Sequence, residues 1–329
     1  MESITKNRQS TAVLKAMIER AYGADQVPDG EDFAAELGHG WFNVAYRLRL
    51  RDGRQAVLKI APPADVTVMT YEQRMMRNEW AAIGLVTDET SVPVPRIDFA
   101  DGSGELCDAD WFVMPFIDAA NLGILQEEGA VGAGEYALLT ERLGALNREL
   151  NGIVGPGFGP LLSPTATSWR EAFTGILEDV LQDGERAGVD LGWGYDEVRA
   201  AIAEHAPALE AVTEPRFVEW DLWPGNVMVR EGEIVAIIDH ERALYGDPLM
   251  EAGFVGTDLP GWGDSDAFMR GYGAAPLTDA ERTRRHLYTL HLVLVMIIET
   301  SYRGHEDPGQ YDMARAALVQ VMALLGRTR

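Results

Sequence analysis

Cysteine is almost absent from this chain of 329 residues, since Cys107 is the only one. A single thiol excludes an intramolecular disulfide and any zinc site built from several cysteines. Long hydrophobic runs are also missing. The most apolar stretch, residues 287–298, contains a histidine and is too short to span a bilayer, so it predicts a buried helix. The first residues lack the apolar core of a signal peptide, and we expect a cytoplasmic protein with no membrane partner.

Lysine is scarce too, and positive charge is scarce overall. The chain has three lysines, at positions 6, 15 and 59, against 25 arginines. Residues 1–117 carry 12 Lys and Arg against 18 Asp and Glu, and residues 118–329 carry 16 against 34. The formal net charge of −24 therefore lies mainly in the C-terminal part. A field of this sign repels nucleic acid, so we expect no such partner; it either attracts a cationic ligand or serves solubility alone.

Lys59 lies in a strand pattern, residues 55–60, whose other members are mostly apolar. A compact ammonium group on a flexible stem suits a phosphate oxygen, although a strand lysine can also reach the rim of a sheet. An Asp-Gly turn before this strand predicts a hairpin with residues 44–50. The preceding turn, residues 38–43, would place backbone N–H groups over nucleotide phosphates. Gly40 and Asn43 are the predicted contacts, whereas His39 either touches phosphate or lies at the surface.

Residues 219–240 hold two acidic residues and one amide at a spacing that suits phosphoryl transfer. Asp221 precedes Asn226 by 5 positions, and Asp239 follows Asn226 by 13. Two apolar patterns flank a polar turn between Asn226 and Asp239, which predicts a hairpin. Such a hairpin returns Asp239 to Asn226, where carboxylate and amide oxygens are suitable ligands for Mg²⁺. Asp221, on the loop just before, can then accept the proton of an attacking hydroxyl group.

This segment resembles the catalytic and metal-binding loops of the aminoglycoside phosphotransferase family, which are small-molecule kinases with a protein-kinase-like fold. The family's catalytic loop usually reads H-G-D-x-x-x-x-N, which Asp221 and Asn226 match. Asp239, Glu241 and the Gly-Asp-Pro run at 246–248 match its metal loop, where an Asp is often followed by W-E or F-E. The resemblance covers nearly the whole chain.

The resemblance implies an α+β, bilobal, protein-kinase-like fold. Residues 1–115 would form a small N-terminal nucleotide-binding lobe with an antiparallel sheet and a helix. Residues 116–329 would form a larger, mainly helical C-terminal lobe for catalysis and substrate binding. Helical spacing over residues 71–86 and 278–302 fits this division.

The resemblance also implies the nucleotide site. Lys59 matches the strand lysine that grips the α- and β-phosphates. Glu79, in the predicted helix 71–86, matches the glutamate that pairs with this lysine, and Glu72 is the alternative. The segment around residues 111–118 matches the hinge between lobes, and its backbone would bind adenine at Met114, Phe116 and Ile117. Pro115 has no N–H group, so the donor must be a neighbour such as Ile117.

Two positions depart from the family pattern. Glu219 stands where the family usually has His, and Trp220 where it usually has Gly. Three outcomes are open: an active enzyme with a rearranged loop, a weak enzyme, or a pseudokinase that only binds nucleotide. Trp220 and Trp223 flank Asp221 and either line the acceptor site or pack the loop. The other predicted substrate contacts are Glu241, Glu251 and Asp258.

The implied activity is transfer of the γ-phosphate of ATP or GTP, with Mg²⁺, to a hydroxyl group of an aminoglycoside or amino-sugar-like substrate, as in antibiotic resistance. The acidic C-terminal part fits a cationic acceptor. Residues 221–226 read DLWPGN, which is similar to the ketosamine kinase branch and keeps a glycated amine possible. Choline, homoserine and neutral sugars are further acceptors in the family.

Overall fold

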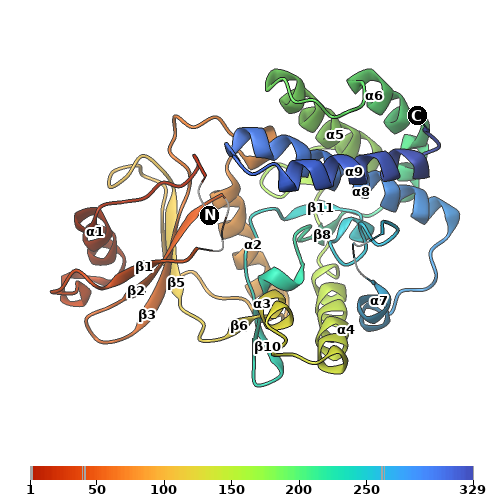
Figure 1. The fold of residues 1–329 in the computed structure, drawn as a ribbon. Helices are drawn as coiled ribbons and strands as arrows, with labels where there is room; N and C mark the ends of the chain where they lie inside the picture. Colours follow the sequence, from red (N-terminus) through yellow and green to blue (C-terminus); the bar gives the residue numbers. More distant parts are fainter. Residues whose placement is uncertain (1–2, 39, 41, 261, 263, 329) are drawn as a thin grey trace.

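The structure is a computed structural model that describes residues 3–38, 40, 42–260, 262 and 264–328. A five-stranded antiparallel sheet with the order β1-β2-β3-β5-β4 lies at one end, and most helices lie at the other (Figure 1). The strands of this sheet are β1 (Ala34–Glu36), β2 (Val44–Arg49), β3 (Gln55–Ile60), β4 (Phe99–Asp101) and β5 (Trp111–Pro115).

Strand β3 lies at the centre of the sheet and carries Lys59. In the predicted β2–β3 hairpin Lys59 is opposite Ala45, and on the other side it is opposite Phe112 of β5. Helix α1 (Thr11–Tyr22) covers the sheet, and its Leu14, Met17 and Ile18 share an apolar core with β2, β3 and β5. The sheet therefore holds the Lys59 backbone in fixed register.

Helix α2 (Met75–Glu89) joins the two parts of the molecule. It begins four residues later than predicted, because residues 70–72 form a separate 3₁₀ turn and Arg74 has a left-handed φ of 67°. Ala82 and Val86 of α2 belong to the core of the helical part, not to the core of the sheet. The division of the chain at residue 115 therefore stays a prediction.

The remaining helices pack around one large apolar core. They are α3 (Leu122–Glu127), α4 (Ala133–Leu150), α5 (Trp169–Arg186), α6 (Tyr195–His205), α7 (Asp266–Tyr272), α8 (Asp279–Tyr302) and α9 (Gly309–Leu324). Helix α8 starts at a capping box in which Thr278 and Glu281 satisfy each other's backbone N–H groups. It contains the apolar run 287–298, which is buried as predicted. Within the described ranges, every helix is too short or too polar to cross a membrane.

Two small sheets position the loops that carry Asp221 and Asp239. One has the order β10-β9-β6 and the other β7-β11-β8. Their strands are β6 (Ala120–Asn121), β7 (Gly159–Pro160), β8 (Arg216–Val218), β9 (Val227–Arg230), β10 (Glu233–Ile237) and β11 (Leu244–Gly246). Strands β9 and β10 pair antiparallel, so the predicted hairpin is confirmed. Ile238 N donates to Asn226 O at 3.0 Å, which brings the chain just before Asp239 beside Asn226.

The close crossing of α4 and α7 gives a first test of the fold. A Cβ atom on Gly271 of α7 would lie 1.6 Å from Glu141 O of α4, and backbone atoms cannot move aside as a flexible side chain can. We expect Gly271→Ala to lower the free energy of unfolding by more than about 2 kcal/mol in urea titrations. The control is Gly175→Ala in α5, where an added Cβ meets nothing within 4 Å. It should leave stability unchanged or raise it by about 0.5–1 kcal/mol, and equal effects of the two variants would contradict the close crossing of α4 and α7.

Candidate active site

Strand β3 places Lys59 among three carboxylates. Its Nζ donates to Glu79 Oε2 at 2.7 Å and to Glu241 Oε2 at 3.1 Å, and a further short hydrogen bond reaches Asp239 Oδ1. Glu79 comes from α2, whereas Asp239 and Glu241 follow β10. The side chains are buried except that of Asp239, which is 36% exposed. We call these four residues the lysine–carboxylate cluster, and it opens to solvent at Asp239.

The protonation of the lysine–carboxylate cluster follows from its burial and its charges. Burial would lower the pKa of Lys59, but the three carboxylates together hold it well above its usual value. Burial raises the pKa of Glu241 to about 8, with Asp239 and Glu79 adding to the rise. Burial also raises the pKa of Glu79. Burial acts in the same direction on Asp239, yet the Lys59 ammonium outweighs it and lowers the pKa of that carboxyl.

The donor set of this cluster fits a hard divalent cation. Glu79, Asp239 and Glu241 each offer one oxygen, and these oxygens lie within 4.8 Å of one another. Mg²⁺ prefers such carboxylate ligands together with water and phosphate oxygens. Asn226, the other predicted ligand, is buried, and its Nδ2 donates to Asp221 O at 2.9 Å. The structure thus places Asn226 between the two loops, and its role as a metal ligand stays a prediction.

Asp221 lies on the loop between β8 and Asn226, and its side chain is 29% exposed. Arg242 Nε approaches Asp221 Oδ2 at 3.8 Å and comes from the loop that carries Asp239. Burial raises the pKa of Asp221, whereas the Arg242 guanidinium opposes that rise. Asp221 therefore keeps an open carboxylate edge beside a fixed positive charge.

The backbone conformation at Trp220 explains why the family usually has glycine at this position. Its φ of 63° is left-handed, a conformation that suits glycine and costs about 1–2 kcal/mol for another residue. Only 5% of the residue is exposed, and its ring packs on Tyr71, His291 and the Arg242 guanidinium. Of the two alternatives for Trp220, packing of the loop is the one that the structure supports, because the ring is inside the protein. Trp223 is 51% exposed and remains a candidate.

Glu219, the second departure, has a partner that the sequence interpretation missed. Its Oε1 lies 2.8 Å from His240 Nδ1, and His240 Nε2 lies 3.0 Å from Ile237 O. Both side chains are buried. Burial lowers the pKa of His240, but the Glu219 carboxylate more than offsets this and raises it. The available signal was a histidine directly after Asp239, where the family often has Trp or Phe.

Glu251 supports the Asp221 loop from inside. It is fully buried, and its carboxylate accepts hydrogen bonds from the backbone N–H groups of Glu219, Leu222 and Ala252, each at 3.1 Å. The prediction of a substrate contact at Glu251 is therefore wrong, since a ligand has no access to this carboxylate.

The other two acids predicted to contact substrate already have partners. Glu241 belongs to the lysine–carboxylate cluster and also accepts a hydrogen bond from Asn43 Nδ2. The prediction that Glu241 contacts the substrate is therefore wrong, because its side chain is buried beside Lys59. Asp258 pairs with Arg285 and, at 3.0 Å, with His286. Its contact with a substrate stays a prediction.

In the predicted hinge, the Phe116 N–H group already has a backbone partner. Phe116 N donates to Gln55 O at 3.1 Å, and the Arg47 guanidinium lies 4.2 Å from the centre of the Phe116 ring. Ile117 N has no acceptor among the residues that the structure describes, which fits the predicted adenine donor better than Phe116 N does. Met114 pairs with Val57 in the sheet. The adenine contacts themselves stay predictions.

An N-terminal segment that the sequence interpretation did not use holds the predicted phosphate turn. Lys6 Nζ donates to Asn43 O at 3.0 Å, and Thr5 Oγ1 donates to Phe42 O at 2.8 Å. A Cβ on Gly40 would lie 3.8 Å from Lys6 Nζ, so this turn and Lys6 are close neighbours. His39 and Trp41 of the same turn lie outside the described residues.

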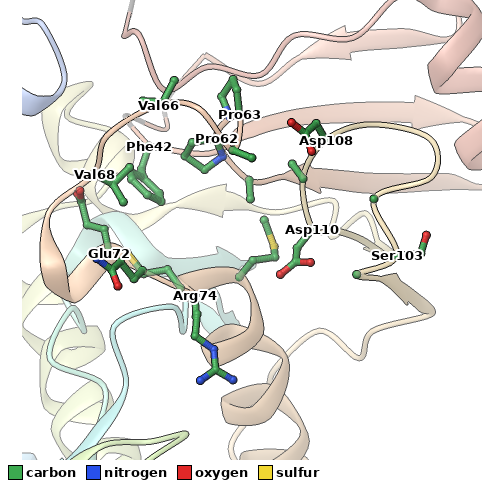
Figure 2. Close-up of a pocket in the computed structure, with 18 residues that line it drawn as sticks. Phe42, Pro62, Pro63, Val66, Val68, Glu72, Arg74, Ser103, Asp108 and Asp110 are labelled. Carbon is green, nitrogen blue, oxygen red and sulfur yellow. The ribbon is translucent and has the colours of Figure 1, made fainter.

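A cavity of about 390 Å³ lies elsewhere, between the chain that joins β3 to α2 and the loop 102–110. Figure 2 shows Pro62, Val66 and Val68 on one side of it and Asp108 and Asp110 on the other. Its lining includes Phe42 of the predicted phosphate turn but none of Lys59, Asp221 and Asp239. This cavity therefore does not contain the lysine–carboxylate cluster.

Comparison with known proteins places this geometry in context. The sequence model of the phosphotransferase enzyme family matches residues 34–288. Comparison with curated protein sequences gives no match.

Solved structures agree over nearly the whole chain. A thermostable mutant of aminoglycoside phosphotransferase APH(4)-Ia, in complex with AMP-PNP and hygromycin B, is 16% identical with a TM-score of 0.66, covering 96% of this chain and 99% of that one. A proposed fructosamine-3-kinase from Thermobifida fusca is 22% identical with a TM-score of 0.63, covering 94% and 99%. The predicted kinase-like, two-part α+β fold is confirmed.

Glu251 gives a pH test of the loop support. Burial, with a smaller contribution from Glu219, raises the pKa of Glu251 to about 8 from an ordinary value of 4.5. The folded chain keeps this proton where the unfolded chain has lost it, so stability should fall as pH rises between these two values. We expect Glu251→Gln to reduce that fall in urea titrations at pH 5, 6.5 and 8. Asp266→Asn, at an exposed position, is the control, and parallel curves for Glu251→Gln and the wild type would contradict the assignment.

Proposed function

The chain belongs to the phosphotransferase enzyme family, and we propose that it is a kinase that transfers the γ-phosphoryl group of ATP or GTP to a hydroxyl group of a small molecule. The observation that carries this proposal is the lysine–carboxylate cluster beside the Asp221 loop. A buried ammonium, a set of carboxylates and a nearby partly exposed carboxylate are the groups that phosphoryl transfer needs.

The nucleotide phosphates would lie over Lys59. Glu79 holds the Lys59 ammonium at 2.7 Å and keeps it directed toward the opening at Asp239. The turn with Gly40 and Asn43 lies close, since Asn43 bonds to Glu241 of the cluster. Adenine or guanine would contact the backbone at Met114 and Ile117. The solved neighbour with AMP-PNP supports a nucleotide donor.

Asp239 and Asn226 would hold Mg²⁺, with the Glu241 carboxylate within reach. The ion, when bound, neutralises charge on the phosphates. Asp239 is suited to this because Lys59 keeps its carboxyl ionised and because it is the most exposed carboxylate of the cluster.

Asp221 would act as the general base. Its carboxylate accepts the proton of the acceptor hydroxyl while the hydroxyl oxygen bonds to the γ-phosphorus. The bond from that phosphorus to the bridging oxygen breaks, and ADP or GDP leaves. Arg242, 3.8 Å from Asp221, favours the ionised base before the proton arrives.

We assign the acceptor to hydroxyl-bearing cationic molecules, with aminoglycosides or amino sugars first. The exposed Trp223 lies two residues after Asp221 and offers a face for a sugar ring. The acidic excess of residues 118–329 favours ammonium groups. The neighbour that holds hygromycin B supports the same class. A ketosamine is the second candidate, supported by the DLWPGN segment and by the fructosamine-3-kinase neighbour.

Release of ADP or GDP tests the proposed function directly. Purified protein with Mg²⁺ and either nucleotide should release diphosphate only when an acceptor is added from a panel of aminoglycosides, amino sugars, ketosamines, choline and homoserine. Nucleotide binding without acceptor-dependent release across the whole panel would favour a nucleotide-binding pseudokinase.

The Asp221→Asn variant separates chemistry from binding. Removing the general base should lower kcat by roughly 10²- to 10⁴-fold, because proton transfer in the transition state is lost. Nucleotide affinity, measured by calorimetry, should stay within about two-fold of the wild type, since Asp221 makes no contact with Lys59 in the structure. Turnover near the wild-type rate would remove Asp221 from the role of base.

The Asp239→Asn variant should show the opposite pattern. Loss of one carboxylate charge at the open end of the cluster should weaken binding of the Mg²⁺–nucleotide complex by about ten-fold or more. Binding of the nucleotide in the presence of a chelator should change little. An unchanged affinity for the Mg²⁺ complex would contradict the metal role of Asp239.

A further inference from the structure

The loops that carry Asp221 and Asp239 are tied together by one buried pair. Glu219 lies two residues before Asp221, and His240 directly follows Asp239. Glu219 Oε1 and His240 Nδ1 are 2.8 Å apart, and the two residues are 2% and 0% exposed. This side-chain hydrogen bond joins the two loops at positions next to Asp239 and two residues from Asp221.

The surroundings of His240 fix the orientation of its ring. Nε2 faces the Ile237 carbonyl oxygen, which can only accept, so Nε2 donates at 3.0 Å. Nδ1 and Glu219 Oε1 form the second hydrogen bond of the ring. Removing one partner of this buried contact leaves the other without its hydrogen bond, which is strongly unfavourable.

Two strained residues sit next to this pair, one on each loop. Trp220, beside Glu219, has a φ of 63°, and Asp239, beside His240, has a φ of 71°. Residues other than glycine keep a left-handed backbone conformation only where surrounding contacts enforce it. The Glu219 backbone N–H is held as well, by Glu251 at 3.1 Å. The Glu219–His240 pair therefore lies where loss of its hydrogen bond would let the strained backbone at Trp220 and at Asp239 relax.

We propose that Glu219 and His240 are positioning residues that set the separation of the Asp221 and Asp239 carboxylates. The acidic member stands on the loop where the family usually has a histidine, and the imidazole stands on the other loop, where the family often has Trp or Phe. This inference rests on the proposed kinase function and assigns Glu219 to an active enzyme, not to a pseudokinase.

The test uses single, double and exchanged variants of the pair. Glu219→Gln and His240→Gln keep the approximate size of each side chain and remove the carboxyl group or the imidazole. Misplacing the base relative to the phosphates should lower kcat by roughly 10- to 100-fold, with nucleotide KM less affected than kcat. The exchanged protein, with Glu219→His and His240→Glu together, again has a carboxyl group facing an imidazole. Its kcat should exceed that of either of its own single variants by about ten-fold or more.

The matched control breaks an ion pair that touches neither loop. Arg20 Nη1, in α1, donates at 2.6 Å to Oδ2 of the buried Asp101 in β4. Arg20→Gln should lower the melting temperature while kcat per folded molecule stays unchanged. If Glu219→Gln and His240→Gln behave in the same way, or if the exchanged protein recovers nothing, the positioning role is overturned.

Unfolding measurements keep this inference separate from the kinase proposal. If the wild type transfers phosphate to no acceptor, the proposed function is wrong, and the kcat values of the variants cannot be compared. The free energies of unfolding of the wild type, the two Gln variants and their double variant still test the pair. The double variant should lose clearly less stability than the sum of the single losses. Additive losses would overturn the pair itself.

Discussion

The burial of Lys59 with Glu79, Asp239 and Glu241 is the interaction on which the site depends. One ammonium and three carboxylates leave an excess of negative charge in a place with little water, which is unfavourable unless it is compensated. Burial raises the pKa of Glu241 to about 8, and protonation of this carboxyl relieves part of the excess. A divalent cation would relieve it more completely. Because the three carboxylates come from α2 and from the loop after β10, the cluster also fixes the two parts of the molecule against each other.

The Asp221 side of the site is supported by packing that replaces the family's usual residues. Trp220 takes a left-handed conformation in place of glycine, and its buried ring helps to hold Arg242 beside Asp221. Glu251 satisfies three backbone N–H groups of the same region. These contacts offset the backbone strain at Trp220, so the protein itself holds the loop in this conformation.

The sequence alone identified the parts of the site that depend on local pattern. The β9–β10 hairpin brought Asp239 back to Asn226, and the scarcity of lysine singled out Lys59. Prediction from the sequence failed where the contact partner of a residue lies far away along the chain. Glu251 is predicted as a substrate contact because its burial is not visible in a loop sequence. The sequence leaves two alternatives open for Trp220 because its ring packs on residues from α8 and the 70–72 turn. His240 and Lys6 were missed for the same reason: each acts through a contact that only the folded chain creates.

We propose that the lysine–carboxylate cluster holds a divalent cation together with nucleotide phosphates. Electron paramagnetic resonance of Mn²⁺, used in place of Mg²⁺, measures this arrangement. Adding a non-hydrolysable ATP or GTP analogue to the protein should remove the signal of free Mn²⁺ at one ion per chain and reveal coupling to phosphorus nuclei. If the nucleotide binds while the Mn²⁺ signal shows no phosphorus coupling, the ion and the phosphates occupy different places and the proposed metal site is wrong.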